Sequence, residues 1–131
     1  MQTNGKFDLE DRTLDFSKNV IRYCKSLPNN TINFKLIDQL VRSACSIGAN
    51  YREANDSLGK KDFVHRLRIS RKEAKETIYW LELIVEANPD KKATVVPLLT
   101  EAIELRNILS AIITKSVWNI DYWVLVFVCI L

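Results

Sequence analysis

The chain has 131 residues, a length that fits one domain rather than several and is sufficient to bury a hydrophobic core. Its formal net charge of +3 is a mild excess, which permits an acidic partner without demanding one. The composition is ordinary for a globular protein, and three glycines and three prolines leave little room for long loops.

The cysteines and the two ends of the chain bear on the cellular compartment. Three widely spaced cysteines without a C-x-x-C pair favour reduced thiols over a disulfide framework or a zinc site: Cys24, Cys45 and Cys129. The opening MQTNGKFDLEDR lacks the apolar core of a signal peptide. The C-terminal run YWVLVFVCIL has ten residues, about half of the ~20 that span a bilayer. We therefore expect a cytoplasmic protein without a membrane-spanning segment.

The first two predicted helices are separated by the turn sequence SLPNNT. Residues 9–27 form the first helix, whose apolar face at helical spacing consists of Leu9, Phe16, Val20, Cys24 and Leu27. Pro28 disfavours helix at the residue before it, and asparagines suit a turn. Asn30 or Thr31 then caps a second helix, which runs to about residue 57.

The second helix has an apolar stripe and, beside it, a polar one. The apolar stripe comprises Leu36, Ile37, Leu40, Val41, Ala44, Ile47, Tyr51 and Ala54. Polar residues follow alternating steps of four and three, the spacing of a helix that packs on helices: Gln39, Ser43, Ser46, Asn50 and Glu53.

A third helix over residues 61–87 follows a short turn at Gly59. Its core positions are Phe63, Leu67, Ser70, Ala74, Ile78, Leu81 and Val85. The fourth helix covers residues 94–116, with Pro97 in its first turn, where the missing N–H costs nothing. These elements predict an all-α, up-down-up-down four-helix bundle over residues 1–116, followed by an apolar C-terminal extension, residues 117–131.

The sequence lacks a complete set of residues for catalysis or for metal binding. A carboxylate-bridged metal pair needs two E-x-x-H motifs, whereas this chain has one histidine, His65, preceded by Asp62. We interpret His65 as a surface residue near a helix start. Nucleophilic catalysis is not favoured either. The chain has no second histidine that could act as the base for Ser43, Ser46 or a cysteine, and no turn motif that would expose such a nucleophile. We therefore expect no enzyme, cofactor or metal.

Basic residues gather on one side of the third helix. The basic stripe, which we define as Arg68, Arg71, Lys72 and Lys75, lies away from the core positions, and Lys60 and Lys61 precede it. A one-sided basic surface is expected where a protein contacts phosphates. The alternative is a solvated helix face with pairs of opposite charge one turn apart, and the sequence leaves both open.

The later part of the chain carries more apolar surface than one bundle can bury. The segment TIYWLELIVEA is apolar nearly all round, and we expect an oligomer interface at Tyr79, Trp80 and Leu83. The fourth helix has two apolar lines: Leu98, Leu105, Leu109 and Ile112, and Val95, Leu99, Ile103 and Ile113. These residues favour self-association over isolated exposed apolar side chains.

The run QLVRSACSIGANYREANDSLGKKDFVHRLRISRKEAKETIYWLELI resembles the bacterial four-helix-bundle proteins encoded by intervening sequences within 23S rRNA genes. That family is similar to the accessory variability determinant proteins of diversity-generating retroelements. The resemblance covers residues 7–116, and its most specific part is R-x-x-x-S-I-x-x-N-x-x-E followed by a basic turn and an aromatic: Arg42, Ser46, Ile47, Asn50, Glu53, Lys60, Lys61 and Phe63. Gly48 departs from the family, which commonly has proline there, so we expect a softer kink in the second helix.

The resemblance implies a homo-oligomer, a pentameric barrel of bundles, with a basic surface for nucleic acid. The retroelement relatives also bind a reverse transcriptase. We therefore expect a non-enzymatic, homo-oligomeric nucleic-acid-binding protein that uses the third helix. A protein-interaction adaptor, for example for a retroelement reverse transcriptase, is the alternative.

Two further expectations concern the polar residues and the C-terminal extension. A structural polar seam is expected to fix helix register, with Glu53 opposite Arg66 and Asn50 near Ser70: Arg42, Ser46, Asn50, Glu53 and Arg66. A ligand site in that seam is the less favoured alternative. The extension has high β propensity and one charge, so we expect it to dock on the third or fourth helix of its own or a neighbouring chain through Trp118 and Trp123. Peripheral membrane contact is less favoured.

Overall fold

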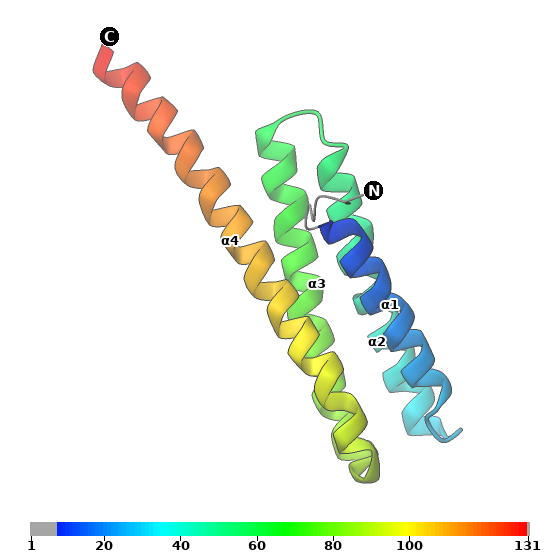
Figure 1. The fold of residues 1–131 in the computed structure, drawn as a ribbon. Coiled ribbons are helices and arrows are strands. Elements are labelled where there is room, and N and C mark those ends of the chain that lie inside the picture. Colours follow the sequence, from blue (N-terminus) through cyan, green and yellow to red (C-terminus); the bar gives the residue numbers. More distant parts are fainter. Residues whose placement is uncertain (1–7, 131) are drawn as a thin grey trace, which may run out of the picture.

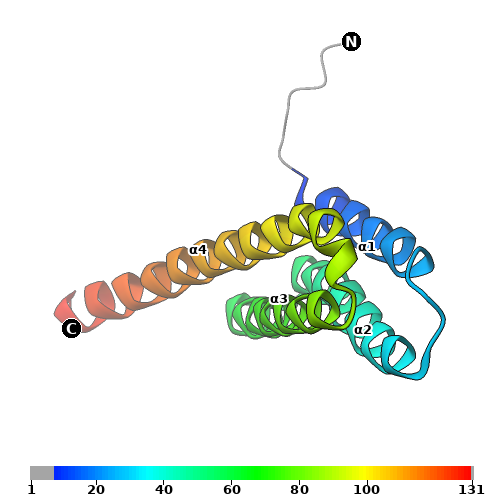
Figure 2. The same ribbon diagram turned by 90° about the horizontal axis from the view of Figure 1, so that it is seen from below.

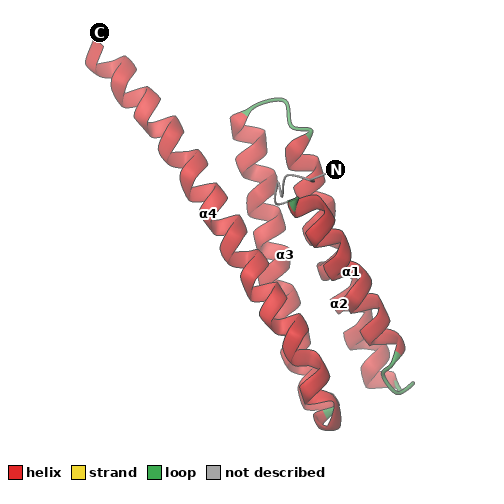
Figure 3. Ribbon diagram, in the orientation of Figure 1, coloured by secondary structure: helices red, strands yellow, loops and turns green. Residues whose placement is uncertain are grey.

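The computed structural model describes residues 8–130, without the side chains of residues 119–123. Its elements are α1 (Leu9–Lys25), α2 (Thr31–Asn55), α3 (Lys60–Ala87), the short 3-10 helix η1 (Pro89–Lys91) and α4 (Lys92–Ile130). Successive long helices run in opposite directions and are joined by short connections (Figure 1, Figure 3). The predicted all-α, up-down-up-down four-helix bundle is confirmed.

Local capping explains where the first two helices begin. The side chain of Asp8 accepts a hydrogen bond from the Glu10 backbone N–H at 2.9 Å and caps α1. The side chain of Asn30 accepts from the Asn33 N–H at 2.8 Å and caps α2, so Asn30 rather than Thr31 is the cap. These bonds satisfy backbone donors that have no partner within the helix.

The predicted position of Pro97 in the first turn of the fourth helix is wrong. Because η1 leads directly into α4, the helix begins at Lys92 and Pro97 lies inside it. The start was missed because Pro89, at the first position of η1, begins a helical turn where the sequence suggested a loop.

The core lies between all four long helices. Helix α1 contacts α2 and α4, and α3 also contacts both, so α1 and α3 lie on a diagonal of the bundle. The five predicted core residues of α1 and its following turn are buried: Leu9, Phe16, Val20, Cys24 and Leu27. The second predicted apolar line of the fourth helix is partly core and partly surface. Its residues Val95 and Ile113 are buried, whereas Ile103 on the same line is exposed.

The predicted end of the fourth helix at residue 116 is wrong, because the C-terminal extension is the last part of α4. Helix α4 continues to Ile130, since no proline or glycine follows Pro97 to end it. Figure 2 shows this end of α4 projecting away from the other helices. Among the described side chains, large apolar ones are exposed there: Trp118, Val124, Leu125, Phe127, Val128 and Ile130.

This exposure contradicts docking of the extension on its own chain, at least for Trp118, which is 70% exposed. The side chain of Trp123 lies outside the described residues. Packing against a neighbouring chain stays a prediction. Within residues 8–130, none of the helices has both the length and the apolar character required to cross a membrane.

Candidate nucleic-acid interface

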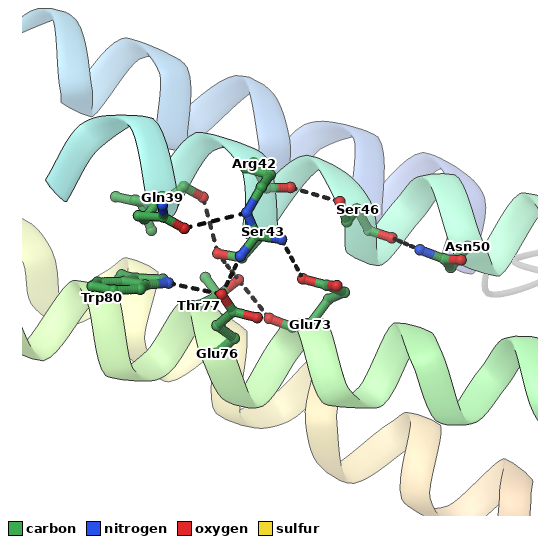
Figure 4. Close-up of polar contacts among 10 residues, drawn as sticks. Gln39, Arg42, Ser43, Ser46, Asn50, Glu73, Glu76, Thr77 and Trp80 are labelled. Carbon is green, nitrogen blue, oxygen red and sulfur yellow. Dashed lines mark hydrogen bonds and ion pairs between the residues drawn. The ribbon is translucent and has the colours of Figure 1, made fainter. Parts of the chain in front are cut away.

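Arg42 on α2 binds two carboxylates of α3. Its Nη1 lies 3.3 Å from Glu73 Oε2, and its Nη2 contacts Glu76 Oε1. The indole N–H of Trp80 donates to the same Glu76 oxygen at 3.2 Å, and Arg42 Nε donates to Gln39 at 3.3 Å. Figure 4 shows these side chains meeting between the two helices. The carboxylates in the middle of α3 are therefore held against α2.

The basic residues of α3 face solvent. Lys60, Lys61, Arg68, Lys72 and Lys75 are exposed, and Arg71 is half-buried. Across residues 8–130, none of these six cations forms an ion pair. The pair expected for a solvated helix face, four residues apart on α3, joins Arg66 and Asp62 at 3.9 Å and lies outside the basic stripe.

The carboxylates nearest the basic stripe contact α2 instead of the stripe. Lys61, Arg68, Lys72 and Lys75 recur at helical spacing along one face, and the helical rise places Lys61 and Lys75 about 21 Å apart. Glu73 and Glu76 contact Arg42 on α2, so within residues 8–130 neither forms an ion pair with these four cations. A row of this length, whose cations form no ion pair with the described residues, suits a polyanion, whose phosphates exchange counterions for lysine and arginine.

The predicted structural polar seam differs from the observed contacts. Buried hydroxyl groups join α2 to α3, because Thr77 Oγ1 lies 3.0 Å from Ser43 Oγ and Ser70 Oγ donates to the Ile47 carbonyl at 2.7 Å. These small side chains reach a partner at close helix separation without burying a charge.

The expectation that Glu53, opposite Arg66, belongs to a buried polar seam is wrong. Glu53 is exposed, and the carboxylate next to Arg66 is that of Asp62. Ser46 and Asn50 donate to carbonyls within α2, those of Arg42 at 2.7 Å and Ser46 at 2.9 Å. A solvated pair of long side chains gains little from meeting, so an apparent match in register does not ensure contact.

Two polar contacts elsewhere in the bundle are structural. Arg12 on α1 reaches Glu101 on α4 through two hydrogen bonds of 2.5 and 3.0 Å, and hydrogen bonding to Glu101 raises the pKa of Arg12. Asn33 and Asn88 exchange two side-chain hydrogen bonds of 3.0 and 2.9 Å. The burial of Asn33 could have been predicted from the sequence. It lies seven residues before the core residue Leu40, on the apolar side of α2.

The predicted oligomer interface residues are accessible on α3. Tyr79 is 53% exposed, whereas Trp80 and Leu83 are half-buried. The two aromatic rings pack edge to face, with centroids 5.0 Å apart. Tyr79 thus continues the exposed face that carries Lys72 and Lys75.

The chain is similar to proteins of one helical family. A family model described as 23S rRNA-intervening sequence protein matches residues 6–111. A crystal structure of a protein with unknown function, from the S23 ribosomal protein family of Bacteroides thetaiotaomicron VPI-5482, is 34% identical with a TM-score of 0.74. The similarity covers 81% of this chain and 98% of that chain. No curated protein matches the sequence.

Proposed function

Because the chain belongs to the 23S rRNA-intervening sequence protein family, we propose that it is a non-enzymatic, homo-oligomeric protein that binds nucleic acid through α3. The main support for this proposal is the basic stripe, whose cations form no ion pair within residues 8–130. The nearby carboxylates of Glu73 and Glu76 contact Arg42 instead. Phosphate contacts of this kind bind RNA and DNA alike and carry little sequence information.

Self-association complements this binding mode. One stripe offers few phosphate contacts, but several copies in one assembly raise the effective concentration of stripes along a strand. The resemblance to the pentameric retroelement relatives and the exposed apolar end of α4 both support a homo-oligomer.

A salt titration with RNA and DNA tests the proposal. We expect affinity to fall steeply with salt, and replacement of the basic stripe by glutamine to weaken binding to all sequences. A matched variant with glutamine at four other exposed lysines loses the same charge and should bind nearly as the wild type: Lys18, Lys25, Lys35 and Lys92. Equal losses in the two variants would indicate a net-charge effect and contradict an interface on α3.

The exposed apolar residues favour a second candidate, a protein-interaction adaptor. Tyr79 and the end of α4 present large apolar side chains that a polypeptide partner would cover. A reverse transcriptase that stays bound after nuclease treatment, together with purified protein that ignores nucleic acid, would favour the adaptor.

A further inference from the structure

A hollow of about 620 Å³ lies at the turn between α2 and α3. It is lined by the turn residues Leu58 and Gly59 and by the first residues on this side of α3: Lys60, Lys61, Asp62, His65 and Arg68. The three lysine and arginine side chains are exposed and, within the described residues, form no ion pair. The single carboxylate in the lining, that of Asp62, lies 3.9 Å from Arg66. The hollow is therefore electropositive.

Backbone donors add to this charge. Gly59 precedes α3 and provides no side-chain cap, in contrast to Asp8 and Asn30 at the earlier helices. The first backbone bond of α3 runs from the Phe63 N–H to the Gly59 carbonyl, so the preceding N–H groups have no acceptor within the helix. Such a helix start favours an anion, and phosphate in particular.

We propose that this hollow binds the terminal phosphate monoester of a nucleic-acid strand, whose following phosphates contact the basic stripe. The proposal rests on the nucleic-acid binding proposed above. A phosphate monoester carries about −1.5 to −2 charges at neutral pH and three acceptor oxygens. An internal phosphate diester carries one negative charge, and the strand continues on both sides of it.

The position of the hollow selects an end rather than an internal phosphate. It lies where α3 begins, and Leu58 and Gly59 form one side of it. From there the exposed cations lead in one direction only, from Lys61 to Lys75 over about 21 Å. A strand whose end lies in the hollow would present its terminal phosphate to Lys60, Lys61 and Arg68 and its following phosphates to this row.

The test compares one single-stranded oligonucleotide with a 5′-phosphate, a 3′-phosphate or hydroxyl groups at both ends. We expect the full-length protein to bind a phosphorylated end roughly tenfold more tightly than the hydroxyl form. The two phosphorylated forms show which end is recognised. Inorganic phosphate, at constant ionic strength, should compete for this added affinity and leave binding of the hydroxyl form unchanged.

Two double variants locate the effect. Lys60→Gln with His65→Gln, both at exposed positions in the lining of the hollow, should reduce the preference for a phosphorylated end. Lys72→Gln with Lys75→Gln should weaken binding of every oligonucleotide and retain the full preference. Equal affinity for all three ends, or a preference that is unchanged in Lys60→Gln with His65→Gln, would overturn the terminal-phosphate site and leave nucleic-acid binding intact. Failure to bind any oligonucleotide would overturn both proposals.

Discussion

At the level of single residues, Asn33 and Asn88 join two connections at one end of the bundle. Asn33 lies in the first turn of α2 and also donates to the Pro28 carbonyl at 2.9 Å. Asn88 lies between α3 and η1 and also donates to the Ile84 carbonyl at 3.0 Å. Because the residues are 1% and 4% exposed, their amides cannot exchange these bonds for water.

We expect Asn33→Ala to destabilise the fold by about 1–3 kcal/mol, because the Asn88 amide would remain buried without its partner. Urea denaturation measures the change in the free energy of unfolding. Asn29→Ala, at an exposed position in the preceding turn, is the control and should cost little. Asn33→Ala combined with Asn88→Ala should cost less than the sum of the two single changes. Additive losses would refute the coupling.

Cys24 links a buried thiol to alkaline stability. Burial raises the pKa of Cys24 from its ordinary value of 9.0 to about 11. The folded protein therefore holds this proton over a pH range in which the unfolded chain releases it. The contribution is fully present below pH 9 and is lost as the pH rises to 11.

We expect this thiol to remove about 2 kcal/mol of stability between pH 9 and 11. Cys24→Ala should flatten the fall in the free energy of unfolding with pH, even though it lowers stability at pH 7 by leaving a cavity. Cys129→Ala, at an exposed cysteine, should keep the wild-type slope. Identical slopes in all three proteins would show that Cys24 does not contribute.

At the level of helices, α1 and α2 approach closely at Gly48. A Cβ atom at this position would lie 2.8 Å from Thr13 Oγ1 and 3.1 Å from Thr13 Cβ. Thr13 cannot easily move, because it is buried and its hydroxyl contacts the Leu9 and Glu10 carbonyls at 2.9 and 3.0 Å. Helix α2 continues without interruption from Thr31 to Asn55, so Gly48 does not break the helix. The absence of a side chain at Gly48 instead allows α1 to approach α2.

Gly48→Ala should destabilise the protein by about 1–3 kcal/mol, since the overlap with Thr13 outweighs the gain of about 1 kcal/mol in helix propensity. In a Thr13→Ala background, the same substitution should become neutral or stabilising. Thermal unfolding of the four proteins measures this reversal. Gly59→Ala, before the start of α3, is a control for steric overlap alone, because its added Cβ would meet no atom within 4 Å. A stabilising effect of Gly48→Ala alone would contradict the close contact.

At the level of the whole molecule, the end of α4 is a helix with apolar side chains around its circumference. Leu125 is 63% and Phe127 is 69% exposed, although both are large and apolar. A helix of this character is ordinarily covered on all sides, which the single chain does not achieve. Neighbouring copies would bury this surface and Tyr79 together.

Light scattering at low concentration should therefore give a multiple of the 15.1 kDa chain mass, and the resemblance implies five copies. Deleting residues 118–131, or combining Leu125→Lys with Phe127→Lys, should lower the assembled mass or the thermal stability. Val96→Lys changes an exposed apolar residue within the bundle and should have little effect. A stable monomer would refute self-association, and a dimer would contradict only the pentamer.

The sequence by itself determined that the chain forms four long helices, that their directions alternate, and on which side of α3 the cations lie. These features depend on hydrophobic periodicity and turn residues, which act over one or two helical turns. The turn at Gly59 and the core face of α1 are examples, because neighbouring residues alone specify them.

Only the tertiary structure decided which polar residues pair and which remain exposed. Arg42 meets Glu73 and Glu76, Arg66 meets Asp62 instead of Glu53, and Asn33 meets Asn88. The partners of Arg42 and Asn33 lie 31 to 55 residues away along the chain, so local spacing does not specify them. Long side chains at the surface can reach several partners, and small differences in packing and solvation decide which of them they contact. For that reason the sequence predicted where the charged residues lie on each helix, whereas the packed helices were needed to show which of them form ion pairs.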